Sequence, residues 1–81
     1  MTAVTPTLTL DQLRRDIADV LGEEPADIPL DENLVDYGLD SVRLMTLVGR
    51  WRETYGVDAA LTDLAERPAI EEWATLLKLP A

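Results

Sequence analysis

The chain of 81 residues is long enough for one small domain, and its 47% hydrophobic content can supply a single core. It contains no cysteine and no histidine, which excludes a disulfide framework, a thiolate metal site and the Ser–His couple of nucleophilic catalysis. The formal net charge of −9 argues against nucleic-acid binding, and no apolar run approaches the roughly 18 residues of a membrane span.

The first eight residues, MTAVTPTL, are small and rich in threonine, and we expect a flexible leader over residues 1–8. They lack the basic and apolar regions of a signal peptide, so we expect a cytoplasmic protein. Thr9 then fits a helix N-cap with Gln12 in the capping-box position. Apolar residues follow at helical spacing as far as Gly22, a residue type that commonly ends helices. A helix over residues 10–21 is therefore predicted.

Residues 22–40 form a long and acidic connection that contains Pro25, Pro29 and Gly38. Loops of this length are often functional, or are held in place by their own apolar side chains. The stretch starting at residue 31 resembles a calcium loop only at first. Val35 stands where such a loop needs a ligand, and Asp36 stands where it needs glycine. We therefore expect a solvated acidic loop without a metal site.

The clearest predicted helix starts at Asp40 or Ser41, either of which could be its N-cap, and ends before Gly56. The residues predicted to face the core are Leu44, Leu47, Val48, Trp51 and Tyr55. Val42 and Met45 lie off this stripe, close to Ser41. They form either an exposed docking patch or a rim contact with the next helix, and the sequence leaves both options open.

Two further helices are predicted in the last third of the chain. Residues 59–65 fit a short helix capped by Asp58, and Pro68 fits the start of another. The inward-facing residues predicted for that last helix are Ile70, Trp73, Leu76 and Leu77. No stretch alternates with the period of a β-strand. The sequence thus predicts an all-α fold, a small four-helix bundle with three main helices and one short helix.

Ser41 is the only serine in the chain and admits two interpretations. It could cap the helix, because a serine oxygen accepts hydrogen bonds from the amides of the first turn. It could instead be a point of attachment, because a helix N-terminus favours a bound phosphate and Gly38 permits a tight approach. A nucleophile needs an activating base, and the chain has neither histidine nor a G-x-S-x-G turn, so we expect no catalytic residue.

The segment LVDYGLDSVRLM, residues 34–45, resembles the phosphopantetheine-attachment motif of carrier proteins, and most closely that of aryl carrier proteins in nonribosomal siderophore and related pathways. The resemblance continues through RWRETYGVD (50–58) and LAERPAIEEWATLL (64–77), and it spans roughly residues 10–78. It implies an acyl-carrier-protein-like four-helix bundle whose second long helix opens with the serine. We accordingly expect a carrier domain over residues 9–79.

The resemblance also implies the chemistry. Ser41 would carry 4′-phosphopantetheine, transferred from coenzyme A by a separate phosphopantetheinyl transferase that recognises the flanking Asp40. The thiol of this arm would hold an acyl group as a thioester, and the protein itself would catalyse nothing. The residues assigned by resemblance to partner docking are Val42, Arg43, Met45, Leu61 and Ala65.

The helix after Ser41 indicates the subfamily. It carries Arg43, Arg50 and Arg52 with Glu53 as its only acid between residues 42 and 55, unlike the acidic helix of fatty-acid-type carriers. We therefore expect a stand-alone, monomeric aryl carrier that is loaded by an aryl acid adenylating ligase and unloaded by a condensation enzyme. The alternatives are a peptidyl carrier and an unmodified acidic helical adaptor. One departure from relatives is Ala69, where they often have a threonine cap.

Overall fold

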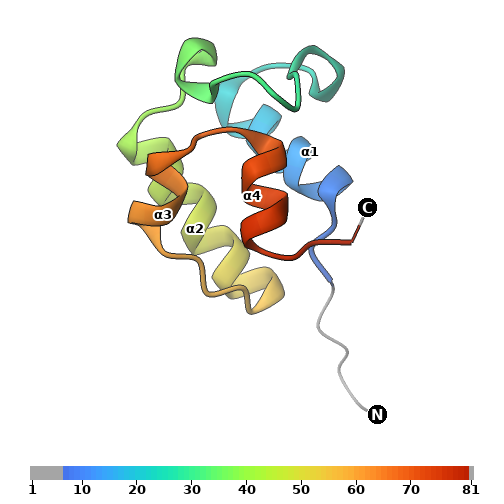
Figure 1. The fold of residues 1–81 in the computed structure, drawn as a ribbon, viewed down its shortest axis with the longest axis vertical. Helices are drawn as coiled ribbons and strands as arrows, with labels where there is room; N and C mark the ends of the chain where they lie inside the picture. The colour runs from blue at the N-terminus through green and yellow to red at the C-terminus, as the bar shows by residue number, and fades with distance from the viewer. Residues whose placement is uncertain (1–6, 81) are drawn as a thin grey trace.

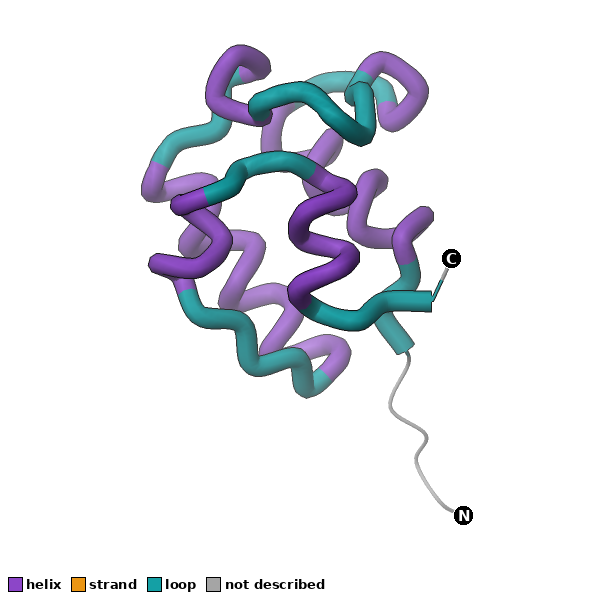
Figure 2. Tube along the Cα trace, viewed as in Figure 1, coloured by secondary structure: helices purple, strands orange, loops and turns teal. Residues whose placement is uncertain are grey.

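The fold is built from four α-helices and two short 3₁₀ helices, which the computed structural model describes over residues 7–80 (Figure 1). The α-helices are α1 (Leu10–Leu21), α2 (Ser41–Tyr55), α3 (Leu61–Glu66) and α4 (Ile70–Leu76), and the 3₁₀ helices are η1 (Pro25–Asp27) and η2 (Leu34–Tyr37). Only helices and loops occur over residues 7–80 (Figure 2). The predicted all-α fold with four helices is confirmed. No helix within these residues is long and apolar enough to cross a membrane.

The two long helices begin and end as predicted. The backbone N–H of Gln12 donates to Thr9 Oγ1 (3.2 Å) at the start of α1, and Gly22 ends that helix in the left-handed region. Gly56 ends α2 with φ of 66°, a conformation that costs a residue with a side chain more than it costs glycine. In a complete capping box the Gln12 side chain would accept from the backbone N–H of Thr9. Here that side chain donates to Asp16 Oδ1 instead (2.9 Å), so only the bond to Thr9 Oγ1 forms.

The boundaries of the two short helices differ from the predictions. Asp58 was predicted to cap α3, but that helix begins at Leu61 after Ala60, which provides no side-chain cap. The Asp58 carboxylate accepts instead from Arg52 Nη2 (3.2 Å). Helix α4 begins at Ile70 after Ala69 rather than at Pro68. At its other end Leu76, predicted to face inward, is 46% exposed.

The core is centred on the indole rings of Trp51 and Trp73, which meet edge to face with centroids 6.0 Å apart and an interplanar angle of 76°. Both rings are fully buried, as their helical spacing predicted. Trp73 Nε1 donates to the Leu64 carbonyl of α3 (2.9 Å), so α4 is bonded to α3 through the core.

Leu8, which the sequence assigned to the leader, is only 2% exposed and belongs to the core. Residues 1–6 of that leader lie outside the described residues.

Asp16 is the buried charged residue of this core, and its hydrogen bonds join α1 to α2. Its carboxylate accepts from Trp51 Nε1 (3.0 Å) and from the Gln12 side chain, and Arg50 Nη1 lies 3.6 Å away. A buried carboxylate is tolerated when it is hydrogen-bonded and paired in this way. Partial burial raises the pKa of Tyr55, and the nearby negative charge of Asp16 raises it further.

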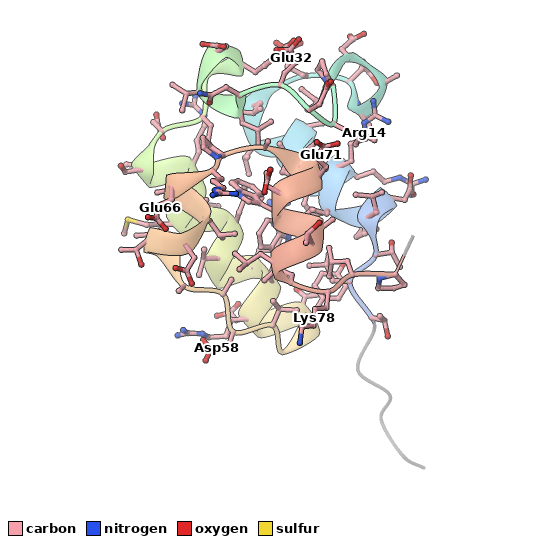
Figure 3. All side chains as sticks on the ribbon, in the orientation of Figure 1. Arg14, Glu32, Asp58, Glu66, Glu71 and Lys78 are labelled. Atoms are coloured by element: carbon pink, nitrogen blue, oxygen red, sulfur yellow. The ribbon has the colours of Figure 1, made fainter. Side chains whose placement is uncertain are left out.

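The long connection between α1 and α2, residues 22–40, arches over one end of the helices (Figure 1). Arg14 Nε donates to the Ile28 carbonyl (3.0 Å), and the N–H of Glu71 at the start of α4 donates to the Leu30 carbonyl (3.0 Å). Figure 3 labels Arg14 and Glu71 beneath this loop. A third bond runs from Leu34 N–H to the Pro68 carbonyl (2.7 Å). The loop is therefore fixed to α1 and α4, and it delivers the chain to α2 along a defined path.

Candidate functional site

Ser41 is the first residue of α2, and its side chain is exposed. The preceding residue, Asp40, has extended backbone angles and acts as the N-cap, with its Oδ1 accepting from the Arg43 backbone N–H (2.8 Å). Of the two N-caps that the sequence allowed, Asp40 and Ser41, the helix therefore uses Asp40. Since a carboxylate already satisfies the first turn, the Ser41 hydroxyl is not used to cap the helix.

The approach to Ser41 is a tight turn that leads from η2 into α2. Gly38 ends η2 with φ of 102°, in a region that residues with side chains rarely adopt, and a side chain built there would meet open space. The next residue, Leu39, is buried, and its N–H donates to the Leu34 carbonyl (3.1 Å). Leu39 thus anchors the turn in the core, and the chain then emerges at Asp40 and Ser41.

Asp40 is an exposed carboxylate held at both oxygens by one neighbouring residue. The hydrogen bond from the Arg43 backbone N–H lowers the pKa of Asp40 most, and desolvation opposes this effect. The Arg43 guanidinium, with Nη1 2.8 Å from Oδ2, lowers the pKa further, and the net shift is downward. Asp40 is therefore ionised and paired at neutral pH. A carboxylate paired in this way is a poor general base for the adjacent hydroxyl, so activation of Ser41 would have to come from another protein.

The guanidinium of Arg43 makes two further hydrogen bonds within the chain. Its Nε donates to the Val20 carbonyl in the last turn of α1 (3.0 Å), and Nη1 donates to the Gly38 carbonyl (3.3 Å). The resemblance had assigned Arg43 to a docking surface, and about half of its side chain is indeed exposed. Its internal bonds were not predicted, because backbone carbonyls leave no mark in a sequence.

The other residues assigned to docking lie exposed on α2 and α3, which are neighbours in the fold (Figure 1). Val42 is 72% exposed, Met45 57% and Leu61 38%, and Ala65 is also exposed. Val42 and Met45 therefore lie off the buried stripe, as predicted. Within α3, Leu64 faces the core and is fully buried. Val42 and Met45 thus present apolar side chains to solvent in the first turns of α2, directly after Ser41.

The site therefore combines an exposed hydroxyl with the N-terminus of a 15-residue helix. The dipole of such a helix favours a negative group at this end, and a phosphodiester on Ser41 Oγ would lie there. The residues present thus fit the attached group that the resemblance implies.

Comparison with known proteins agrees with this geometry. Residues 11–77 match a family described as "Phosphopantetheine attachment site". The chain is 52% identical over 69 residues to an isochorismatase of Bacillus subtilis, 46% over 70 residues to the acyl carrier protein ScoB of Streptomyces coeruleorubidus, and 42% over 67 residues to a phenyloxazoline synthase of Mycolicibacterium paratuberculosis. These alignments cover 85%, 86% and 83% of this chain. They span 22% of the isochorismatase and 6% of the synthase, but 81% of the Streptomyces protein.

The fold also matches a solved structure. The NMR structure of the HMG-ACPI domain from the CurA module of Lyngbya majuscula superposes with a TM-score of 0.73, at 26% sequence identity, over 95% of this chain and 82% of that one. Members of the matched family bind 4′-phosphopantetheine covalently through a serine. The chain therefore belongs to the phosphopantetheine-attachment family, as a helical carrier domain that bears its substrate on this group and is not itself catalytic.

Proposed function

We propose that Ser41 is the residue that carries 4′-phosphopantetheine. The observation that carries this proposal is the division of roles at the start of α2, where Asp40 caps the helix and leaves an exposed serine hydroxyl at the first helical position. Ser41 is also the only serine of the chain, and the family uses a serine. The alternative of an unmodified acidic adaptor has no support from this arrangement.

The attachment reaction uses the Ser41 hydroxyl as the acceptor. Its Oγ would attack the phosphorus of coenzyme A that bears the pantetheine arm, which forms a phosphodiester. The bond from that phosphorus to the oxygen bridging to the nucleotide would break, adenosine 3′,5′-bisphosphate would leave, and the hydroxyl proton would pass to a base of the transferase. The attached arm supplies a thiol, on which an acyl group is held as a thioester.

We further propose that the acyl group is aromatic. Isochorismatase and phenyloxazoline synthase are among the relatives, and the second name denotes a phenyl-bearing product. The carrier would be loaded by an aryl acid adenylating ligase and unloaded by a condensation enzyme of nonribosomal synthesis in the cytoplasm. Loading the modified protein with a panel of aryl acids and amino acids, each with its ATP-dependent ligase, tests this step. Exclusive transfer of amino acids would establish the peptidyl alternative instead.

Intact mass after incubation with coenzyme A and a broad-specificity transferase tests the attachment residue. We expect one phosphopantetheine on the parent and none on Ser41→Ala. Thr46→Ala is the matched control, because it removes another hydroxyl from the first turns of α2, one that donates to the Val42 carbonyl (3.0 Å). It should be modified like the parent. Since Asp40 holds the cap, Ser41→Ala should change the free energy of unfolding by less than about 0.5 kcal/mol. Modification of Ser41→Ala, or none of the parent, would refute the proposal.

The proposed docking surface consists of exposed apolar side chains on two neighbouring helices, Val42 and Met45 of α2 and Leu61 and Ala65 of α3. A charge placed there contacts water in the free protein but would be desolvated in a complex. Met45→Asp should therefore keep the parent's melting temperature and its attachment of phosphopantetheine, and should slow acyl transfer to the condensation partner. Met45→Leu, which keeps the apolar surface, is the control. Transfer by Met45→Asp at the parent rate would show that the partner docks elsewhere.

A further inference from the structure

The guanidinium of Arg43 lies where three segments of the chain converge. Its Nε donates to the Val20 carbonyl in the last turn of α1, and its Nη1 donates to the Gly38 carbonyl and to Asp40 Oδ2, at 3.0, 3.3 and 2.8 Å. These acceptors belong to the end of α1, to the turn that leads into α2, and to the N-cap of α2. Arg43 itself lies two residues after Ser41.

The bond to Val20 supplies a donor to a carbonyl at the end of α1. The last four carbonyls of a helix have no partner within it, and the last turn of α1 carries no basic side chain of its own. The Ala18 and Asp19 carbonyls are occupied by the amides that follow the helix, at Glu23 and Gly22. The Val20 carbonyl receives its donor from α2. The same guanidinium therefore caps α1 from outside and fixes the turn that precedes Ser41.

We propose that Arg43 is a positioning residue for the attachment reaction, and that its fork of donors, rather than its charge, holds the Ser41 hydroxyl where a transferase can reach it. This inference rests on the proposed function of Ser41. It assigns to Arg43 a role inside the carrier in place of the docking role expected from resemblance. Asp40 Oδ1 would remain the acceptor of the α2 cap without the guanidinium, but the turn at Gly38 would lose its tie to α1.

The substitution Arg43→Lys distinguishes positioning from docking through charge, because it keeps the positive charge but removes the planar set of hydrogen-bond donors. A guanidinium presents five donors in a rigid plane, whereas an ammonium is a single point of charge on a flexible stem. Arg43→Lys could still pair with Asp40, but its donors share one nitrogen and do not reproduce the bonds that Nε and Nη1 make from two fixed positions. A docking contact that depends on charge should therefore survive in Arg43→Lys, whereas positioning should not.

The experiment measures kcat and KM of a broad-specificity transferase for the apo forms of Arg43→Lys and Arg43→Gln. We expect kcat/KM to fall about 10- to 100-fold in both variants, mainly through kcat, since small displacements of a reacting group have effects of this size. Arg52→Lys and Arg52→Gln are the matched controls on α2, because Arg52 is exposed and its one ion pair within residues 7–80 is with the exposed Asp58. They should leave kcat/KM within about twofold of the parent.

Three outcomes would overturn the inference. If Arg43→Lys had the parent's kcat/KM and Arg43→Gln did not, Arg43 would contact the transferase through its charge. A rise in KM with an unchanged kcat would mean the same. Parent-like kinetics in both variants would mean that Arg43 has no part in the reaction. If the parent itself gains no phosphopantetheine, the proposed function of Ser41 fails.

Amide hydrogen exchange tests the positioning role without any transferase. In Arg43→Lys, the amides of Gly22, Glu23, Gly38 and Leu39 should exchange faster than in the parent, while that of Leu47 in the middle of α2 should be unchanged. Unchanged exchange at the first four amides would overturn the inference, whatever the parent does with coenzyme A.

Discussion

The N-terminal pair of helices, α1 and α2, and the C-terminal pair, α3 and α4, are stabilised in different ways. The first pair has 12 and 15 residues, with side-chain N-caps from Thr9 and Asp40 and a glycine directly after the C-terminus of each helix. The second pair has six and seven residues, and both helices follow an alanine that provides no cap. Helix α4 is followed by Lys78 at a positive φ of 54°, where the long helices use glycine.

The difference shows that the second pair depends on tertiary contacts. Helices of six or seven residues are not stable alone in water, so core packing and bonds from elsewhere must hold them. Leu64, Ile70 and Trp73 supply the packing. The Leu30 carbonyl accepts from the N–H of Glu71 in the first turn of α4, which compensates in part for the threonine cap that Ala69 lacks. The helix that bears Ser41 has its own end signals, whereas its neighbours α3 and α4 do not.

The largest effect that tests this comparison comes from the two tryptophans. Trp51→Ala and Trp73→Ala should each lower the free energy of unfolding by about 3–5 kcal/mol, since both rings are fully buried. Chemical denaturation measures the decrease in the free energy of unfolding, and amide hydrogen exchange shows which helices lose protection. In Trp73→Ala the amides of α3 and α4 should lose protection before those of α1 and α2. Equal loss in both pairs would mean that the bundle opens as one unit and that the comparison does not hold.

The helix ends provide a smaller and sharper test. Gly56→Ala forces a side chain into the left-handed region and should cost about 1–2 kcal/mol. Lys78→Gly relieves the same conformation after α4 and should stabilise the fold by up to about 1 kcal/mol. Thermal unfolding measures both. Lys78→Ala is the control, because it removes the charge but not the strain, and it should not reproduce the gain.

The smallest expected effect is the pH dependence of the α2 cap. The folded pKa of Asp40 is lowered, so its contribution to stability is complete above the ordinary aspartate pKa of about 3.9 and disappears as the pH falls through the lowered value. Asn at this position still caps but does not ionise. The difference in stability between the parent and Asp40→Asn should therefore be constant from about pH 7 to 5 and should shrink below about pH 4. A difference that persists at lower pH would show that the ionised carboxylate contributes nothing to it.

Much of the first pair could be predicted from the sequence because its signals are local. A cap and the amide that it binds lie three residues apart, as at Thr9 and Asp40, and Gly22 and Gly56 end the helices directly. The exposed Ser41 next to its aspartate could be found in the same way. The choice between two adjacent caps needed the structure, because Asp40 and Ser41 are equally good cap types.

Contacts that run through the backbone could not be predicted. Arg43 donates to a carbonyl 23 residues earlier, and every residue has a carbonyl, so no side chain identifies Val20 as the acceptor. The same holds for Leu30 and Glu71. Leu8 was missed for another reason, because one leucine in a segment of small residues shows no periodicity.

The edge-to-face contact of Trp51 and Trp73 also gives the protein an intrinsic optical signal. The chain contains only these two tryptophans, one from each pair of helices, with ring centroids 6.0 Å apart. Transitions of two indoles at this distance couple, and near-ultraviolet circular dichroism of such aromatics depends on fixed packing. Separation of the two pairs would therefore abolish this signal, and the far-ultraviolet signal would fall as well, because α3 and α4 depend on tertiary contacts. The unlabelled protein can thus report in real time whether binding of a partner loosens the bundle.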